Sequence, residues 1–407
     1  MVRTTKVIVA ALGLLAAASC NDDRLFRPAN STPISPLFER YVSMGNSITA
    51  GFQSAGINDS TQLQSYAVLL AAQMGTPFFP PLLNRPGCPP PFTNAFLQQR
   101  VGGGTGTTCF LRKIPTIPPP YVTNVAVPGA YVFDPLSNFA GTSHPNQLTT
   151  LFLGGLSQIE AAHRVDPTFV SFWLGNNDVL GAATDLANAG NPAEVTDTSV
   201  FKATLHAALD SLANPKEAPS LKGAILIGAA NVTEIPFFNT GSTYFGIKNT
   251  TTNFPATFIV LPNCAPASLA GQGDSTLIPW PLGAALIGAA AAGATDTLDC
   301  SSDRYVQPAE LDNLLATVNS YNAAISAEAS ARGWAYLDPN PTLDSLHAIP
   351  TQVAPFFGIG KTCAQVPFGL AFSCDAVHPS AATHKLIANK LIQAINAKYG
   401  TSLAAIP

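Results

Sequence analysis

Short apolar runs rich in β-branched or aromatic residues mark five predicted strands, at residues 40–44, 122–127, 168–174, 223–228 and 334–337. Elsewhere, apolar residues recur every three or four positions, which predicts helices at residues 64–74, 156–163, 201–212, 308–331 and 381–399. Strands that alternate with helices in this way are typical of an α/β protein with a mainly parallel sheet. The hydrophobic pattern therefore predicts a five-stranded α/β fold.

Two long stretches interrupt this alternation, at about residues 76–120 and 236–300. Both are rich in Pro, Gly and apolar residues and lack a clear period, so we expect them to be insertions into one domain that covers residues 38–407. Residues 277–294 of the second stretch carry no charge, but Pro279 and Pro281 disfavour a membrane span. A helix packed on the domain or over its site is the favoured interpretation.

The N-terminal residues have the pattern of an export signal. Arg3 and Lys6 precede an uncharged apolar run over residues 7–18, which is short for a membrane span. Residues 17–20, Ala-Ala-Ser-Cys, resemble the lipobox of bacterial lipoproteins. We expect a signal peptide at residues 1–19, a lipidated Cys20 with a tether over residues 20–37, and a membrane-anchored protein at the periplasmic face or cell surface. Ordinary cleavage after the alanines at 16–18 is the alternative and would give a secreted protein.

Removing Cys20 from the seven cysteines leaves an even set of six. In an exported protein such a set suggests disulfides. The six fall into sequence-local pairs, so the predicted bonds are Cys88 to Cys109, Cys264 to Cys300 and Cys363 to Cys374. Zinc binding is the weaker interpretation, because the sequence has no Cys-x-x-Cys or His-Glu-x-x-His spacing.

Composition narrows the classes of protein to consider. Apolar residues make up 47% of the chain and charged residues 11%, which excludes a highly charged disordered chain and suggests an apolar surface or apolar insertions. The net charge is −4 and no run of Lys and Arg occurs, so nucleic acid is not an expected partner.

Two segments contain residues suited to nucleophilic catalysis. Ser47 follows the first predicted strand within Gly45-Asn46-Ser47-Ile48-Thr49-Ala50-Gly51, although a serine there is also an ordinary turn or cap residue. Asp375 and His378 precede the last predicted helix. Their spacing lets the carboxylate orient the imidazole as a general base, while the plain alternative is a turn residue and an exposed histidine.

Two further segments could supply hydrogen-bond donors. Asn177 lies in Gly175-Asn176-Asn177-Asp178 after the third predicted strand, and Gly129 closes the second. A side-chain amide and a glycine N–H at strand ends can stabilise an oxyanion, although turns alone also explain both. Asp178 is expected to support its loop through hydrogen bonds. The other histidines (His144, His163, His206, His347 and His384) have no partner spacing and are interpreted as surface or helix residues.

These four segments, in this order, resemble the conserved blocks of the SGNH or GDSL hydrolase family. The resemblance covers the chain after the tether and implies Ser47 as nucleophile, His378 as base and Asp375 as its orienter. It also implies an oxyanion hole made by Ser47, Gly129 and Asn177. One departure is Asn46-Ser47-Ile48 in place of the family's Asp-Ser-Leu.

The resemblance further implies a flavodoxin-like three-layer α/β/α sandwich and a serine esterase that needs no metal or organic cofactor. The apolar insertions favour an acyl ester as substrate, as in a lipase or acyl esterase. A carbohydrate O-acetylesterase is the alternative within enzymes. The alternative of another class is a surface lipoprotein that binds lipid or glycan on an inactive scaffold.

Overall fold

A four-stranded, fully parallel sheet forms the centre of the computed structural model, which describes residues 32–114, 119, 121–250 and 254–407. Its strands lie in the order β1 (Tyr41–Gly45), β4 (Phe169–Trp173), β5 (Gly223–Ile227) and β10 (Ala335–Leu337). All four coincide with predicted strands to within a residue or two at each end. Apart from Ser43 and Ser171, the strand residues are apolar or glycine, as expected for a sheet covered on both faces.

The second predicted strand, residues 122–127, is not a regular strand. It pairs with the free edge of β1 through one isolated parallel bridge between Ser43 and Asn124. The Ser43 N–H donates to the Thr123 carbonyl, and the Val125 N–H donates to the Ser43 carbonyl. The ladder is incomplete at Gly45: its carbonyl accepts from the Val127 N–H, but its own N–H donates to the Gln158 side chain at 2.9 Å. The predicted five-stranded sheet is thus four regular strands and one irregular edge segment.

Strand order places the carboxyl ends of three segments together. With residues 122–127 counted as the second segment along the chain, the order across the sheet is 2-1-3-4-5, which is flavodoxin-like. Ligands of such sheets bind beyond the carboxyl ends, where the order reverses. Here that point lies at the ends of β1, β4 and the edge segment.

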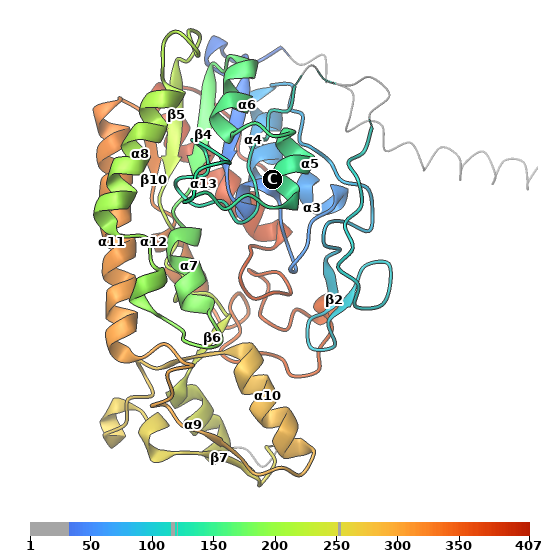
Figure 1. The fold of residues 1–407 in the computed structure, drawn as a ribbon, viewed down its shortest axis with the longest axis vertical. Coiled ribbons are helices and arrows are strands. Elements are labelled where there is room, and N and C mark those ends of the chain that lie inside the picture. The colour runs from blue at the N-terminus through green and yellow to red at the C-terminus, as the bar shows by residue number, and fades with distance from the viewer. Residues whose placement is uncertain (1–31, 115–118, 120, 251–253) are drawn as a thin grey trace, which may run out of the picture.

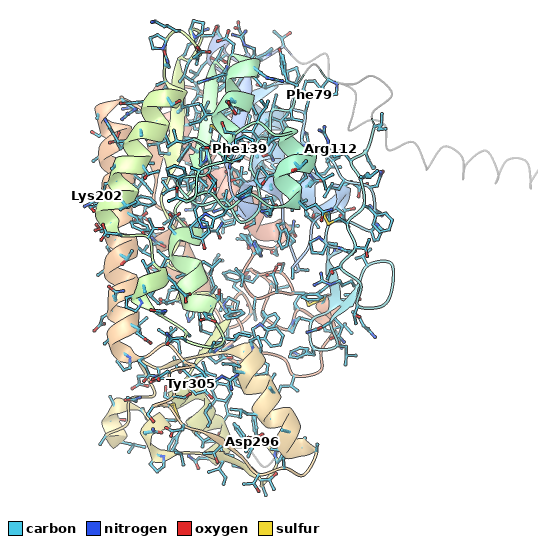
Figure 2. All side chains as sticks on the ribbon, in the orientation of Figure 1. Phe79, Arg112, Phe139, Lys202, Asp296 and Tyr305 are labelled. Atoms are coloured by element: carbon cyan, nitrogen blue, oxygen red, sulfur yellow. A yellow bond between two sulfur atoms is a disulfide. The ribbon has the colours of Figure 1, made fainter. Side chains whose placement is uncertain are left out.

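Two apolar cores cover the two faces of the sheet, so the fold has three layers. One face packs against α4 (Tyr66–Met74) and α13 (Ala381–Tyr399). The other packs against α6 (Gln158–Val165), α8 (Thr198–Leu212) and α11 (Pro308–Ala331). Figure 1 shows α8 and α11 side by side along one flank of the molecule, and Figure 2 marks Lys202 on α8. The predicted α/β/α sandwich is confirmed.

Capping signals explain where the long helices begin and end. α11 begins with Pro308 at its first turn, and Ser380 caps α13 by accepting from the Thr383 N–H at 3.3 Å. Gly400 ends α13 in the left-handed conformation, at φ 63°. Both helices match their predicted bounds. The remaining helices are α2 (Ser47–Ala50), α3 (Asp59–Leu63), α5 (Gln147–Leu153), α7 (Asn177–Thr184), α9 (Gly241–Thr250), α10 (Trp280–Ala291) and α12 (Asn340–His347).

Short two-stranded sheets build the two stretches that were expected to be insertions. The first stretch contains the antiparallel hairpin of β2 (Phe92–Asn94) and β3 (Gln99–Arg100). The second contains β6 (Phe238–Thr240) paired with β8 (Leu277–Pro279), and β7 (Phe258–Val260) paired with β9 (Asp296–Leu298). The second stretch, which also contains α9 and α10, forms the lower part of the molecule in Figure 1. Figure 2 labels Asp296 in the same part.

The apolar segment 277–294 is a packed helix preceded by a short strand. Residues 277–279 are extended as β8, and α10 starts at Trp280 because Pro279 and Pro281 fit the helix start but not its interior. Trp280 packs against Phe96 of the first stretch at 5.2 Å between ring centroids. Within the described residues, no helix is both long and apolar enough to cross a membrane.

Three disulfides join the cysteines in the predicted pairs, Cys88–Cys109, Cys264–Cys300 and Cys363–Cys374. Each closes a local loop outside the parallel sheet. Cys20, the predicted signal peptide and residues 20–31 of the predicted tether lie outside the described residues. The domain boundaries and the lipidated form therefore stay predictions.

Candidate active site

The end of β1 fixes the position of Ser47. Gln158 of α6 bonds both backbone groups of Gly45, accepting from its N–H at 2.9 Å and donating to its carbonyl at 3.0 Å. A side chain at Gly45 would place its Cβ 2.3 Å from the Thr49 Oγ1, so only glycine fits. Asn46 then caps α2 by accepting from the Ile48 N–H at 3.1 Å. Ser47 follows as the first residue of α2 and is 8% exposed.

Ser47, His378 and Asp375 form one hydrogen-bonded chain, although the serine and the histidine are 331 residues apart in the sequence. His378 Nε2 lies 2.8 Å from Ser47 Oγ, and His378 Nδ1 lies 2.8 Å from Asp375 Oδ2. The carboxylate therefore favours the tautomer with a proton on Nδ1, which leaves Nε2 free to accept the hydroxyl proton. The structure brings together all three residues predicted for the triad.

The Asp375 carboxylate is held by donors on both oxygens. Oδ1 accepts from the N–H groups of Val377 at 2.9 Å and His378 at 2.8 Å, and Oδ2 accepts from the Ala55 N–H at 2.6 Å. Burial alone would raise the pKa of Asp375, but the charge and hydrogen bonds of His378 and the Ala55 N–H outweigh it and lower the pKa to about 2. The group is thus ionised throughout the neutral range.

Gly129 lies in the loop after the edge segment, and Asn177 is the first residue of α7, which follows β4. Asn177 Nδ2 donates to the carbonyl of Ala130, the residue after Gly129, at 2.8 Å. An amide nitrogen carries two protons, so a second donor remains on Asn177. Gly129 has φ 85°, in the left-handed region that favours glycine. Within the described residues, the Ser47 and Gly129 N–H groups have no hydrogen-bond acceptor, so both are available to a ligand.

Buried polar residues on either side of Asn177 hold the start of α7. Asn176 accepts from the Ala230 N–H at 2.8 Å through Oδ1, and Asp178 accepts from the Val132 N–H at 3.0 Å through Oδ2. Burial raises the pKa of Asp178 to about 7, because hydrogen bonds only partly offset the loss of solvation. The expected supporting role of Asp178 agrees with these bonds, whereas the anchoring by Asn176 was not predicted.

Two side chains behind the triad were also missed from the sequence. The Phe52 ring centroid lies 4.9 Å from that of His378. His384, expected as an ordinary surface or helix residue, is fully buried, and its Nδ1 accepts from the Tyr66 N–H at 3.3 Å. Burial, and secondarily the charge of His378, lower the pKa of His384 to about 3. The spacing of His384, Ala388 and Leu391 along α13 was the available signal, because it repeats at the helical period.

No group of three or more His, Cys, Asp or Glu side chains placed to hold a metal ion occurs in the part of the chain that the structure describes. The six cysteines outside the N-terminal region are all bonded in pairs.

Fold and site together define an SGNH-type hydrolase. The model of the GDSL-like lipase/acylhydrolase family matches residues 41–391, and the chain belongs to that family. It is therefore an esterase-like hydrolase, and an ester substrate is implied. No curated protein matches the sequence significantly.

Among solved structures, the chain is similar to Axe2, an acetylxylan esterase from Geobacillus stearothermophilus, at 14% identity and a TM-score of 0.39 over 90% of this chain and 96% of that chain. It is also similar to LAE5, an alpha/beta hydrolase from the metagenome of Lake Arreo, Spain, at 13% identity and a TM-score of 0.36 over 88% and 96% of the two chains. Likenesses this distant do not bear on the substrate.

Proposed function

We propose that the protein is a serine esterase that hydrolyses carboxylic esters through an acyl-enzyme on Ser47. The observation that carries this proposal is the continuous chain of 2.8 Å hydrogen bonds from Ser47 through His378 to Asp375. A serine is a weak nucleophile until a base takes its proton, and this geometry supplies the base and its orienting carboxylate.

The reaction proceeds in two halves. Ser47 Oγ attacks the ester carbonyl carbon as its proton passes to His378 Nε2, and the imidazolium is stabilised by the Asp375 carboxylate. The tetrahedral intermediate collapses by breaking the bond to the alkoxide, which takes the proton from His378. A water molecule then attacks the acyl-enzyme as His378 Nε2 takes its proton. The second tetrahedral intermediate breaks its bond to Ser47 Oγ, which takes that proton from His378, and the acid is released.

Three donors are proposed to hold the oxyanion of each tetrahedral intermediate: the N–H groups of Ser47 and Gly129 and the side-chain amide of Asn177. Support comes from their unused hydrogen-bonding capacity and from the bond between Asn177 and the Gly129 loop. Preorganised donors of this kind contribute most where negative charge develops.

An acyl ester is the proposed substrate class, as in a lipase or acyl esterase. Two features support it: the Phe52 ring beside His378, and the exposed apolar side chains of the first insertion, of which Leu97, Leu111 and Ile114 are 61%, 72% and 93% exposed. Apolar surface of this kind suits contact with acyl chains or lipid.

Export and anchoring through a lipidated Cys20 form a separate proposal. The three disulfides support export, because such bonds persist in oxidising compartments. Membrane fractionation and mass spectrometry of the N-terminal peptide test it. A wild-type protein in the membrane fraction that becomes soluble as Cys20→Ala is expected, whereas an unmodified, soluble wild-type protein would contradict anchoring.

The catalytic proposal is tested by initial rates on p-nitrophenyl esters from acetyl to long acyl chains, with a soluble form that begins after Cys20. Turnover that Ser47→Ala abolishes is expected, while Ser301→Ala, which changes an exposed serine just after the second insertion, keeps full activity. A long-chain optimum supports the acyl esterase. An acetyl-only profile favours the carbohydrate O-acetylesterase instead, and no turnover across the series favours a lipid- or glycan-binding lipoprotein.

A further inference from the structure

A tight turn at residues 53–56 lies against the loop that carries Asp375. Gln53 and Gly56 exchange both backbone hydrogen bonds, at 2.8 and 3.2 Å. The two residues between them, Ser54 and Ala55, have φ values of 55° and 51°, in the left-handed region. Residues with a Cβ adopt this region only where the surroundings impose it, so something must hold the turn.

The imposed conformation turns two N–H groups towards the loop at residues 373–378, which carries Asp375 and is called the acid loop below. The Ala55 N–H donates to Asp375 Oδ2 at 2.6 Å, and the Ser54 N–H donates to Ser373 Oγ at 2.8 Å. Ser373 Oγ in turn donates to Asp375 Oδ1 at 3.1 Å. In the reverse direction, Ser54 Oγ accepts from the Cys374 N–H at 3.1 Å. Both carboxylate oxygens of Asp375 thus depend on the turn, directly or through Ser373.

The first insertion holds this turn from the opposite side. Arg100 Nη1 donates to the Ala55 carbonyl at 2.9 Å and to the Pro90 carbonyl at 2.6 Å. The Arg100 guanidinium lies 4.0 Å above the Phe92 ring, and the Phe92 N–H donates to the Ser54 carbonyl at 2.7 Å. The turn is therefore fixed between the β2–β3 hairpin and the acid loop.

The same hairpin reaches the acid loop at a second point. β2 packs against the short 3₁₀ helix Cys363–Gln365, and Cys363 is bonded to Cys374, the residue before Asp375. Two independent contacts thus connect one hairpin with one catalytic loop.

We propose that Arg100 is a positioning residue for Asp375, acting through the Ser54–Ala55 turn and Ser373. Among the described residues, Arg100 forms no hydrogen bond with Ser47, His378 or Asp375; it bonds the Ala55 and Pro90 carbonyls. It holds the Ala55 carbonyl, and it stacks on Phe92. The Phe92 N–H holds the Ser54 carbonyl, which lies in the same planar peptide unit as the Ala55 N–H. These contacts together set the direction of the Ala55 N–H and hence the placement of the carboxylate that orients His378. Small displacements of a catalytic group have large effects on rate, so loosening the turn should lower kcat. The inference rests on the proposed triad.

The kinetic test compares Arg100→Ala with Arg112→Ala. Arg112 is a half-buried arginine of the same insertion whose backbone contacts Asn84 and Leu83. We expect Arg100→Ala to lower kcat about ten-fold with KM nearly unchanged, and Arg112→Ala to leave both unchanged. Arg100→Lys, which can reach a carbonyl but lacks the stacking plane, should recover part of the loss. A higher KM with unchanged kcat in Arg100→Ala would instead assign Arg100 to substrate binding.

A second pair of variants covers the case in which Arg100→Ala does not fold. Ser373→Ala removes both the acceptor of the Ser54 N–H and a donor to Asp375, whereas Ser373→Thr keeps the hydroxyl. We expect a several-fold fall in kcat for alanine and near-complete recovery for threonine. Equal rates for the two would overturn the link between the turn and the carboxylate.

A spectroscopic readout separates this inference from the proposed function. The proton shared by His378 Nδ1 and Asp375 should give a low-field proton resonance, which can be recorded on the wild-type protein without any substrate. We expect Arg100→Ala to broaden or shift it and Arg112→Ala to leave it in place. If no ester is hydrolysed yet this difference appears, the esterase proposal fails and the positioning role stands. An unchanged resonance together with unchanged kcat in a folded Arg100→Ala would overturn the positioning role.

Discussion

Replacing Asp375 with asparagine tests the hydrogen-bond network most directly, because it changes one atom of a carboxylate whose surroundings are all donors. Oδ2 accepts from His378 Nδ1 at 2.8 Å and from the Ala55 N–H at 2.6 Å. The backbone N–H groups of Val377 and His378 keep an acceptor if the asparagine oxygen takes the Oδ1 position. The amide nitrogen then faces the Ala55 N–H and His378.

The imidazole can pair with an amide N–H only through an unprotonated Nδ1. Its proton then resides on Nε2, which can no longer accept from Ser47. We expect kcat to fall by about 10⁴-fold, the loss that a wrong tautomer causes in serine proteases, or about 5.5 kcal/mol in the barrier. The Ala55 N–H also loses its acceptor, which costs about 1–3 kcal/mol of stability.

Stability should respond to pH as well. The pKa of Asp375 is lowered from 3.8 to about 2, so the ionised group stabilises the fold by about 2 kcal/mol above pH 3.8, and this contribution is lost as pH falls through about 2. The Asp375→Asn variant has no carboxyl group at this position, so its stability lacks this dependence on pH. Steady-state kinetics and urea unfolding at several pH values measure both effects, with Asp344→Asn on the exposed face of α12 as control. An Asp375→Asn enzyme that keeps a tenth of wild-type kcat would refute the tautomer argument.

Three further outcomes are expected. Asn177→Ala should lower kcat about 10²- to 10³-fold with KM little changed in steady-state assays; a change confined to KM would count against an oxyanion role. Asp178→Asn should raise the melting temperature above that of the wild type, and by more at pH 8 than at pH 4. The reason is that the pKa of Asp178 is raised to about 7, so the cost of its buried charge appears as pH rises from 3.8 through 7. Equal increases at the two pH values would contradict this. His384→Asn should move the midpoint of acid unfolding to lower pH. The pKa of His384 is lowered to about 3, so the stability that the neutral buried ring contributes above pH 6.5 is lost as pH falls towards 3. An unchanged midpoint would exclude His384 as a cause of acid unfolding.

The sequence predicted the elements whose signals are local. The runs at β4 and β5 are largely apolar, Pro308 marks the start of α11, and Gly400 marks the end of α13. The segment at 122–127 was predicted as a regular strand because its residues are largely apolar. The ladder is incomplete because Gln158, which is distant in the sequence, takes the Gly45 N–H that a regular ladder would use.

The triad residues could be found because each lies next to a predicted element: Ser47 follows the first strand, and Asp375 and His378 precede the last helix. The residues that hold the triad in place could not be predicted in this way. Ser54 and Ala55 give no local signal for a left-handed turn, since glycine or asparagine would be expected there, and the contacts that impose it come from Arg100 and Asp375, far away in the sequence. Such positions become visible only when segments distant in the chain are brought together.

The aromatic cluster outside the sandwich joins three segments that are separate in the chain. Phe96 of the first insertion contacts Trp280 of the second at 5.2 Å and Phe357, which precedes the acid loop, at 6.1 Å between ring centroids. These segments therefore share one core and form a single module. Transplanting either insertion alone into another family member would leave its part of this core without a packing partner. A chimaera designed to keep this module must therefore carry both insertions and the segment around Phe357.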